Sequence, residues 1–233
     1  MEGSLEALLE FLKTSKIPVS AVNIGPIHKR DVIKASIMHE HKPEYATILA
    51  FDVEVDPDAR QAANAGNVTI FTADIIYHLF DQFTTHRLKT LEEEKEKAKD
   101  IAVFPCLVKI MPNMVFNQKD PIICGVTVEE GILKVGTPLC IPKNGFIQVG
   151  RVTSIENNHQ QVEKMGKGSQ CAIQIVNEGN PGMTYGRQFN ADHALYSELS
   201  RESIDALKKY FKDEMSTENW KLVVKLKKVF SII

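Results

Sequence analysis

The sequence predicts two domains of different class: an N-terminal three-layer α/β/α domain with a parallel sheet, and a C-terminal closed β-barrel with two added C-terminal helices. Up to about residue 85, helical and strand-like segments alternate, which is typical of a parallel sheet between helices. From residue 102 onward, short apolar segments are separated by Gly, Pro and Asn turns at barrel-like intervals. We expect an α/β/α domain over 1–85, a long connecting helix over 75–101, and the barrel with its helices over 102–233.

The first domain is built from three helix-strand units. Leu8 and Leu12 lie at helical spacing, and Pro18 ends their helix and opens an apolar run. The run at 45–53 is almost continuously apolar, as in strands that are covered on both faces. The expected elements are a helix capped by Ser4, a strand at 19–25, a helix at 31–41, a strand at 45–53, a helix from Asp58 to Gly66, and a strand at 68–71.

One continuous helix is predicted after Asp74, which can cap it. Its apolar stripe ends at Leu91, and the following segment, 92–100, is charged on nearly every face. That segment places Glu and Lys three or four residues apart, as in Glu96 and Lys99, and such pairs stabilise a solvated helix. A disordered charged linker is the alternative, but no Gly or Pro occurs between Asp74 and Phe104.

The second domain is predicted to consist of short strands followed by two amphipathic helices. Thr217 is a plausible N-cap of the last helix, and Lys225 and Lys228 suit the negative end of its dipole. The expected strands are 104–110, 122–128, 132–135, 138–141, 146–155 and 171–176, and the expected helices are 200–211 and 217–230.

Composition points to an ordinary globular protein of the cytoplasm. The chain has 233 residues, 43% hydrophobic and 25% charged, with a net charge of -2, which argues against a protein that coats nucleic acid non-specifically. The four cysteines show neither metal-ligand nor disulfide spacing, so we interpret them as reduced core thiols. No secretory signal and no apolar run of about 20 residues are present, so no membrane partner is expected.

Motifs for enzyme chemistry are missing. The nearest approach to a phosphate-binding loop, Gly166-Lys-Gly-Ser169, has Gly168 where the loop needs Ser or Thr, and Gln161 where it needs glycine. His39 and His41 are two residues apart and point in different directions on a helix, so no metal site is predicted. Because no nucleophile motif is present either, a small hydrolase is disfavoured.

Two polar features suggest a local nucleic-acid contact. Glu156-Asn-Asn-His159 follows a predicted barrel strand, and barrel loops commonly bind single-stranded ends. Arg187, which follows Gly186, could contact a phosphate or stack on a base. The alternatives are a hairpin turn that uses Asn for its geometry, and an ordinary surface arginine.

Several long strings together resemble the C-terminal half of the archaeal and eukaryotic translation initiation factor 5B family, whose bacterial relative is initiation factor two. The resemblance covers essentially all residues. The strings that carry it are 1–12, Asn23-Ile-Gly-Pro26, Lys29-Arg-Asp-Val32, Ile76-Tyr-His-Leu-Phe-Asp81, Phe104-Pro-Cys106, Gly125-Val-Thr-Val128, Thr153-Ser-Ile-Glu156, Asn158-His159 and Ser203-Ile-Asp-Ala-Leu207.

The resemblance implies a part of a GTPase that promotes ribosomal subunit joining. The α/β domain and long helix would relay the nucleotide state to a barrel that binds the methionylated CCA end of initiator tRNA. GTP and magnesium would bind in a GTPase domain that is absent here, so this chain would hold no cofactor and would not be an enzyme. The implied tRNA-binding residues are Gly125, Glu156, Asn158, His159 and Arg187.

The same resemblance implies protein partners. The ribosomal subunits are expected partners, and in eukaryotic members similar C-terminal helices receive the acidic, apolar tail of initiation factor 1A. Trp220, Leu222, Lys225 and Lys228 are the residues that we expect at that surface, although Trp220 could instead only pack on the barrel. The alternative function is a module that binds only proteins, namely factor 1A and the ribosome.

The chain departs from the family next to the implied tRNA-binding residue Arg187. Where some relatives have His after Gly-Arg, this chain has Gln188 after Gly186-Arg187.

Overall fold

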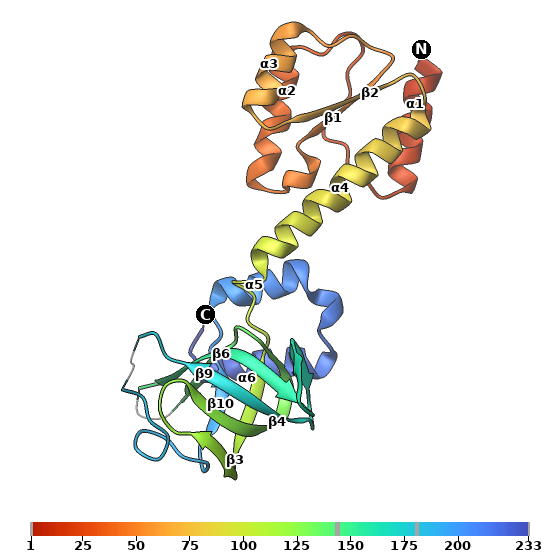
Figure 1. The fold of residues 1–233 in the computed structure, drawn as a ribbon. Coiled ribbons are helices and arrows are strands. Elements are labelled where there is room, and N and C mark those ends of the chain that lie inside the picture. Colours follow the sequence, from red (N-terminus) through yellow and green to blue (C-terminus); the bar gives the residue numbers. More distant parts are fainter. Residues whose placement is uncertain (1, 143–144, 180–181, 233) are drawn as a thin grey trace. The chain divides into compact units, whose positions relative to one another are not determined.

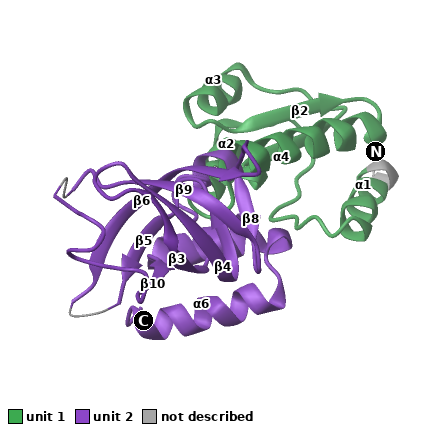
Figure 2. Cartoon of the chain, turned by 60° about the horizontal axis from the view of Figure 1, so that its bottom comes forward, with its two compact units in different colours: residues 1–94 green, residues 95–233 purple. Residues whose placement is uncertain are grey.

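The computed structural model describes residues 2–142, 145–179 and 182–232. The chain divides into two compact units, unit 1 at 1–94 and unit 2 at 95–233 (Figure 2). Each unit has its own apolar cores, and we describe each by itself.

Unit 1 is a small parallel sheet covered by helices on both faces. Strands β1 and β2 pair in parallel, with Thr47 opposite Thr69 and Phe51 opposite Ala73. Its elements are α1 (Glu2–Thr14), α2 (Lys29–Ser36), the 3-10 turns η1 (Ile37–Glu40) and η2 (Pro43–Tyr45), β1 (Thr47–Phe51), α3 (Pro57–Ala65), β2 (Thr69–Ala73) and the first part of α4 (Ile76–Ala98).

Two separate apolar clusters show that unit 1 has three layers. On one face of the sheet, Leu8 and Leu12 of α1 pack with Leu79 and Phe83 of α4. On the other face, a second cluster joins α2 and α3 through side chains that include Val32. Figure 1 shows α2 and α3 on one side of the strands and α1 and α4 on the other. The predicted α/β/α layering is therefore confirmed.

Three details of unit 1 differ from the sequence prediction. Helix α1 begins at Glu2, so the position of Ser4 lies within its first turn and not before the helix. The run 19–25 forms no strand, and Ile24 is 70% exposed. Just beyond the run, Ile27 forms an isolated parallel bridge with Val55. The α-helix predicted over 31–41 tightens into a 3-10 turn at Ile37. An apolar run becomes a strand only where a neighbouring strand supplies the hydrogen bonds.

The charged segment is helical, so the linker alternative is wrong. Helix α4 continues through it to Ala98, and the predicted ion pair between Lys99 and Glu96 forms at 2.6 Å. Within unit 2, the end of α4 is held by Lys95, whose Nζ donates to Glu214 Oε1 at 2.9 Å and lies 5.1 Å from the centre of the Phe211 ring. The last turn of the helix is thus fixed to unit 2 by charge and by an aromatic face.

Unit 2 is a closed barrel of six strands with side hairpins. Antiparallel pairing runs in the order β3-β10-β5-β6-β9-β4, and the pairing of β4 with β3 closes the ring. Its strands are β3 (Cys106–Asn117), β4 (Ile122–Lys134), β5 (Pro138–Ile141), β6 (Ile147–Asn157), β7 (Gln160–Val162), β8 (Lys164–Gly166), β9 (Gln170–Val176) and β10 (Ala194–Ser197).

The interior of the barrel is filled by side chains that are almost fully buried, such as Leu133, Ile155 and Ile175, none more than 1% exposed. A barrel of this size encloses no open channel. The predicted closed barrel is confirmed, and any ligand of the barrel must therefore bind at its outer face, turns or ends.

Two barrel predictions need correction. The segments 122–128 and 132–135 are one strand, β4, because Gly131 adopts φ +82 and lets the chain bend without ending the ladder. The backbone N–H of Ile132 beyond it donates to the carbonyl of Pro105. Strand β10 was not predicted, yet it pairs with both β3 and β5 and completes the ring.

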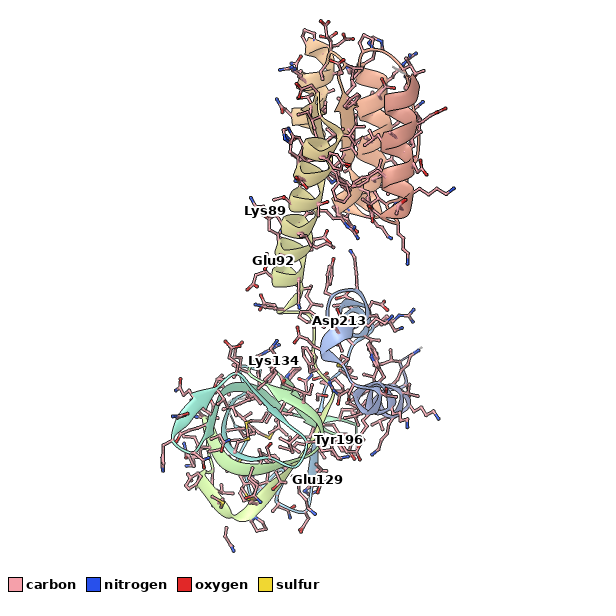
Figure 3. All side chains as sticks on the ribbon, turned by 90° about the vertical axis from the view of Figure 1, so that its right-hand side faces the viewer. Lys89, Glu92, Glu129, Lys134, Tyr196 and Asp213 are labelled. Carbon is pink, nitrogen blue, oxygen red and sulfur yellow. The ribbon has the colours of Figure 1, made fainter. Side chains whose placement is uncertain are left out.

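The C-terminal helices pack on the barrel as predicted. They are α5 (Arg201–Tyr210), the 3-10 turn η3 (Lys212–Glu214) and α6 (Thr217–Val229). Ser216, and not Thr217, caps α6 by accepting a hydrogen bond from the Asn219 backbone N–H. These helices share an apolar cluster with Phe104, which precedes β3. Lys134 of β4, labelled in Figure 3, lies beside this cluster with its Nζ 4.9 Å from the centre of the Phe104 ring.

The four cysteines are buried and free, which confirms their interpretation as core thiols. Burial raises the pKa of Cys106, Cys124 and Cys140 to about 12, and that of Cys171 to about 11. Because the thiolate is the reactive form, these groups are not nucleophiles in the folded barrel.

Candidate nucleic-acid interface

Asn158 and His159 form a two-residue turn between β6 and β7. Asn157 pairs with Gln160, and the two turn residues adopt φ +51 and +63. Two consecutive residues with positive φ define the hairpin turn whose twist matches that of the strands. The turn interpretation of Asn158 is therefore correct, and Asn tolerates this conformation well.

The same turn presents His159 entirely to solvent. Its side chain is 100% exposed, and its Nδ1 lies 3.5 Å from Oε1 of Glu156, which is half exposed. The pair becomes an ion pair when the imidazole is protonated. An exposed imidazole beside a carboxylate offers both donors and acceptors to ribose hydroxyls and base edges. The structure thus brings together Glu156, Asn158 and His159, as the sequence predicted.

Gly125 lies in a row with Glu156 across three strands. Gly125 of β4 is opposite Ala172 of β9, and Ala172 is opposite Glu156 of β6. Cys124 and Val126, on either side of Gly125, point into the barrel, so the glycine faces outward. The row Gly125-Ala172-Glu156 therefore connects the implied glycine to the turn with His159 on the outer surface.

Two methionines cover Gly125. A Cβ atom at this glycine would lie 2.8 Å from Cβ of Met114 and 2.9 Å from Cε of Met111, closer than side chains pack. This contact explains why an outward-facing glycine is buried. Only glycine allows these methionines to approach the strand so closely.

Arg187 lies on a different loop. The backbone of Tyr185 in that loop donates to Gln118 O after β3, and Met183 and Phe189 anchor the loop in the barrel core. Arg187 itself is exposed. Across the described residues, no hydrogen bond or ion pair joins it to the turn with His159.

Gln188 has a role within its own loop. Its Oε1 accepts a hydrogen bond from the Thr184 backbone N–H at 2.9 Å, and its Nε2 donates to the Gly182 carbonyl at 3.2 Å. The amide therefore ties the loop together and leaves Arg187 as the outward-facing side chain.

The predicted protein-binding residues of α6 are divided between two faces. Leu222 is 3% exposed and packs against the position of Gly131, so it belongs to the interior, and its placement at a partner surface was wrong. Lys225 bonds Glu130 of β4 at 3.1 Å. Trp220 is partly exposed, and Lys228 is exposed.

Val224 supplies the exposed apolar position that Leu222 does not. It is 56% exposed and lies four residues after Trp220, hence on the same helical face. Helical spacing could have identified it, because Leu222 and Leu226 share the opposite, buried face.

Comparison with known proteins gives consistent matches. Residues 1–84 match the family model described as Translation-initiation factor 2, and residues 104–196 match Elongation factor Tu domain 4. Eukaryotic translation initiation factor 5B of Homo sapiens is 54% identical to this chain over 234 residues, 99% of the chain and 19% of that protein. The factor 5B of Saccharomyces cerevisiae is 45% identical, over 99% of the chain and 24% of that protein.

The chain is homologous to the C-terminal region of translation initiation factor 5B. A solved structure, GDP-bound aIF5B from Aeropyrum pernix, has the same fold with a TM-score of 0.50 and 29% identity, over 97% of this chain and 37% of that chain. The chain spans about a fifth of the length of the human factor 5B that it matches.

Sequence patterns did not identify some residues that lie around the candidate interface of this factor 5B relative. Met111, Met114 and Ala172 adjoin the implied Gly125, but methionine and alanine carry no motif. Their proximity depends on strand pairing and on an irregularity in β3, which residue patterns do not specify.

No helix of the described residues has the length and apolarity to span a bilayer.

Proposed function

We propose that this chain is part of a translation initiation GTPase that promotes ribosomal subunit joining, and that its barrel binds the methionylated CCA end of initiator tRNA. The observation that carries this proposal is the fully exposed His159 beside Glu156, on a turn that continues the row from Gly125. The similarity to factor 5B supports the same function. A single-stranded end offers the hydroxyls and base edges that such a surface can bind.

Binding of methionylated initiator tRNA to the chain tests this proposal. We expect His159→Ala and Arg187→Ala each to weaken binding by about tenfold, because each removes contacts worth roughly 1–2 kcal/mol. His41→Ala and Arg60→Ala remove the same side chains from exposed positions of unit 1 and should leave affinity unchanged. In a footprinting experiment on the bound tRNA, full protection of the CCA end by both barrel variants would refute the site.

Unit 1 and α4 are proposed to relay the nucleotide state to the barrel. The continuity of α4 from Ile76 to Ala98 supports a relay, as does the attachment of its last turn through Lys95. In this proposal GTP and magnesium bind outside the chain, whose sequence has no phosphate-binding loop. Calorimetric titration with GTP and magnesium should therefore give no binding heat, and saturable binding would contradict the proposal.

Protein binding at α6 is the second candidate function. The exposed Val224 and the partly exposed Trp220, which also packs against the apolar cluster of the C-terminal helices, lie next to Lys221 and Lys228 and fit an acidic, apolar segment such as the tail of initiation factor 1A. Val224→Asp should weaken binding of a tail peptide at least tenfold. Val19→Asp, at a valine of similar exposure in unit 1, is the control. Equal affinity of both variants would exclude this surface.

A further inference from the structure

Helix α2 of unit 1 leaves two large apolar side chains in solvent. Its inner face packs on the sheet and on α3 through Val32, which is 1% exposed, and Ala35. On the outer face, Ile33 and Ile37 are 54% and 57% exposed. Ile37 follows the last residue of α2 with φ -59 and ψ -28, so it continues the helical turn. Because it lies four residues after Ile33, the two side chains are neighbours on one face.

Basic side chains flank this apolar pair. Arg30 lies three residues before Ile33, and Lys34 lies three residues before Ile37. Residues three and four apart are adjacent on a helix, so these four side chains form one continuous outer surface. Both basic residues are exposed. We call Arg30, Ile33, Lys34 and Ile37 the α2 face.

The charge of the α2 face is opposite to that of its unit. Residues 1–94 contain nine Lys and Arg but fifteen Asp and Glu. The acidic residue of α2, Asp31, is engaged at the start of the helix, where its Oδ2 accepts a hydrogen bond from the His28 backbone N–H at 3.0 Å. Within the described part of the chain, no ion pair neutralises Arg30 or Lys34. The face is therefore a local positive surface with an apolar centre.

This combination distinguishes between possible occupants. Apolar side chains rimmed by polar residues are typical of protein-binding surfaces. A pair at helical spacing, about 5–6 Å apart at Cβ, matches the anchors of an amphipathic helix. RNA would gain nothing from the isoleucines, and the acidic excess of unit 1 would repel its phosphates. A second copy that used the same face would place Arg30 and Lys34 against identical charges.

We propose that the α2 face docks an acidic amphipathic helix of a partner protein. Apolar side chains four residues apart on that helix cover Ile33 and Ile37, and carboxylates beside them pair with Arg30 and Lys34. Burial of the apolar side chains provides affinity, and the charge pairs fix how the helix is oriented. The face belongs to unit 1, so the proposal does not depend on tRNA binding by the barrel.

A designed peptide tests this docking on the full chain. The probe is a fluorescent helical peptide of about 18 residues, with leucines four residues apart on one face and glutamates beside them. A second peptide carries lysines in place of those glutamates. Fluorescence anisotropy should show saturable binding of the acidic peptide and at least tenfold weaker binding of the lysine peptide. Failure of the acidic peptide to bind would overturn the proposal.

A variant at the apolar centre locates the binding. Ile37→Asp should weaken binding of the acidic peptide at least tenfold, because it removes an apolar anchor and repels the glutamates. Leu88→Asp is the matched control, at a leucine that is 62% exposed on α4, the helix on the other side of the sheet (Figure 1). It should leave the affinity unchanged. Circular dichroism checks that both variants keep their fold.

Charge reversal separates recognition from a structural effect. A double variant, Arg30→Glu with Lys34→Glu, should lose the acidic peptide and gain the lysine peptide, whereas damage to the fold would weaken both. Lys13→Glu, on α1, reverses an exposed charge on the other side of the sheet and should preserve the preference for the acidic peptide. Unchanged preference in the double variant would place the peptide elsewhere and overturn the proposal.

The other occupants give results of their own. A short RNA duplex that binds more tightly than the acidic peptide, and that loses affinity in the double variant but not in Ile37→Asp, would assign the α2 face to RNA. Concentration-dependent dimers in analytical ultracentrifugation that Ile37→Asp dissociates would assign it to a second copy of this chain. Either result would overturn the docking of an acidic partner helix.

Discussion

The two units of this chain differ in how their sheets end. The barrel of unit 2 closes on itself through the β3–β4 pairing, whereas the sheet of unit 1 has only two paired strands among the described residues. Closure leaves no strand edge in the six-stranded ring. In unit 1, by contrast, the run 19–25 pairs with no strand, and its apolar side chains Val22 and Ile24 are half or more exposed.

The difference explains where binding residues can lie. A filled barrel provides a rigid frame but no internal space, so any recognition group must lie on the outer face or on turns, where the candidate residue His159 lies. Rigid scaffolds with functional loops are a general solution. The contrast also predicts that perturbations of the barrel cause larger losses of stability than perturbations near the unit boundary.

The largest expected effect is on thiol labelling. All four cysteines lie in the barrel, and burial raises their pKa to about 11 or 12. Labelling of the folded chain should therefore be slower than labelling in denaturant by a factor on the order of 10³ or more, because it requires opening of the barrel. Mass spectrometry of timed reactions measures the rates. Rapid modification of even one cysteine under native conditions would show that the ring is less closed than described.

A glycine substitution should produce the next largest effect. At Gly131, a Cβ would lie 2.0 Å from the Pro105 carbonyl oxygen, and the backbone has φ +82. Gly131→Ala combines this collision with an unfavourable conformation and should destabilise unit 2 by about 3–5 kcal/mol. Urea denaturation measures the loss.

Gly136→Ala separates the two causes. Gly136 has a similar φ of +88, but nothing lies within 4 Å of its Cβ position. This control should cost only about 1–2 kcal/mol, the penalty for the left-handed conformation. Equal losses of stability in the two variants would mean that the contact between Cβ and the Pro105 carbonyl adds nothing to the cost of Gly131→Ala.

Much of this fold was predictable because it depends on local patterns. The apolar run that became β1 and the helical stripe of α4 carry their periodicity in the sequence, and Gly and Pro mark most barrel turns. Strand β10 has only four residues and no such signal. It becomes a strand because its backbone pairs with β3 on one side and with β5 on the other. The run 19–25 fails in the opposite way, since its pattern suits a strand but no neighbour pairs with it.

The candidate site was predictable to a similar degree. Turn residues such as Asn158 and His159 are consecutive, so sequence alone places them together. The proximity of Gly125 to Glu156 depends instead on the register of three strands, and was implied only by resemblance. Met114 reaches Gly125 because of a bulge, which arises from the pairing of β3 with β4 and not from its own residues.

The smallest expected effect concerns the attachment of α4 to unit 2. The hydrogen bond from Lys95 lowers the pKa of Glu214 below its usual value of 4.5. A lowered pKa in the folded state means that the carboxylate stabilises unit 2 above about pH 4.5, and that this stabilisation is lost as the pH falls through the lowered value. Because the pair is partly exposed, Glu214→Gln should cost only about 0.5–1 kcal/mol at pH 7.

Urea denaturation of unit 2 at two pH values checks the assignment of this effect to Glu214. The difference between Glu214→Gln and the unmodified chain should be present at pH 7 and should shrink toward zero as the pH falls through the lowered pKa of Glu214, because the native carboxylate is then protonated as well. Asp213→Asn neutralises the neighbouring exposed carboxylate and should have little effect at either pH. If the loss in Glu214→Gln is the same at both pH values, packing of the side chain and not its charge holds the end of α4, and the helix is attached to the barrel by its apolar contacts alone.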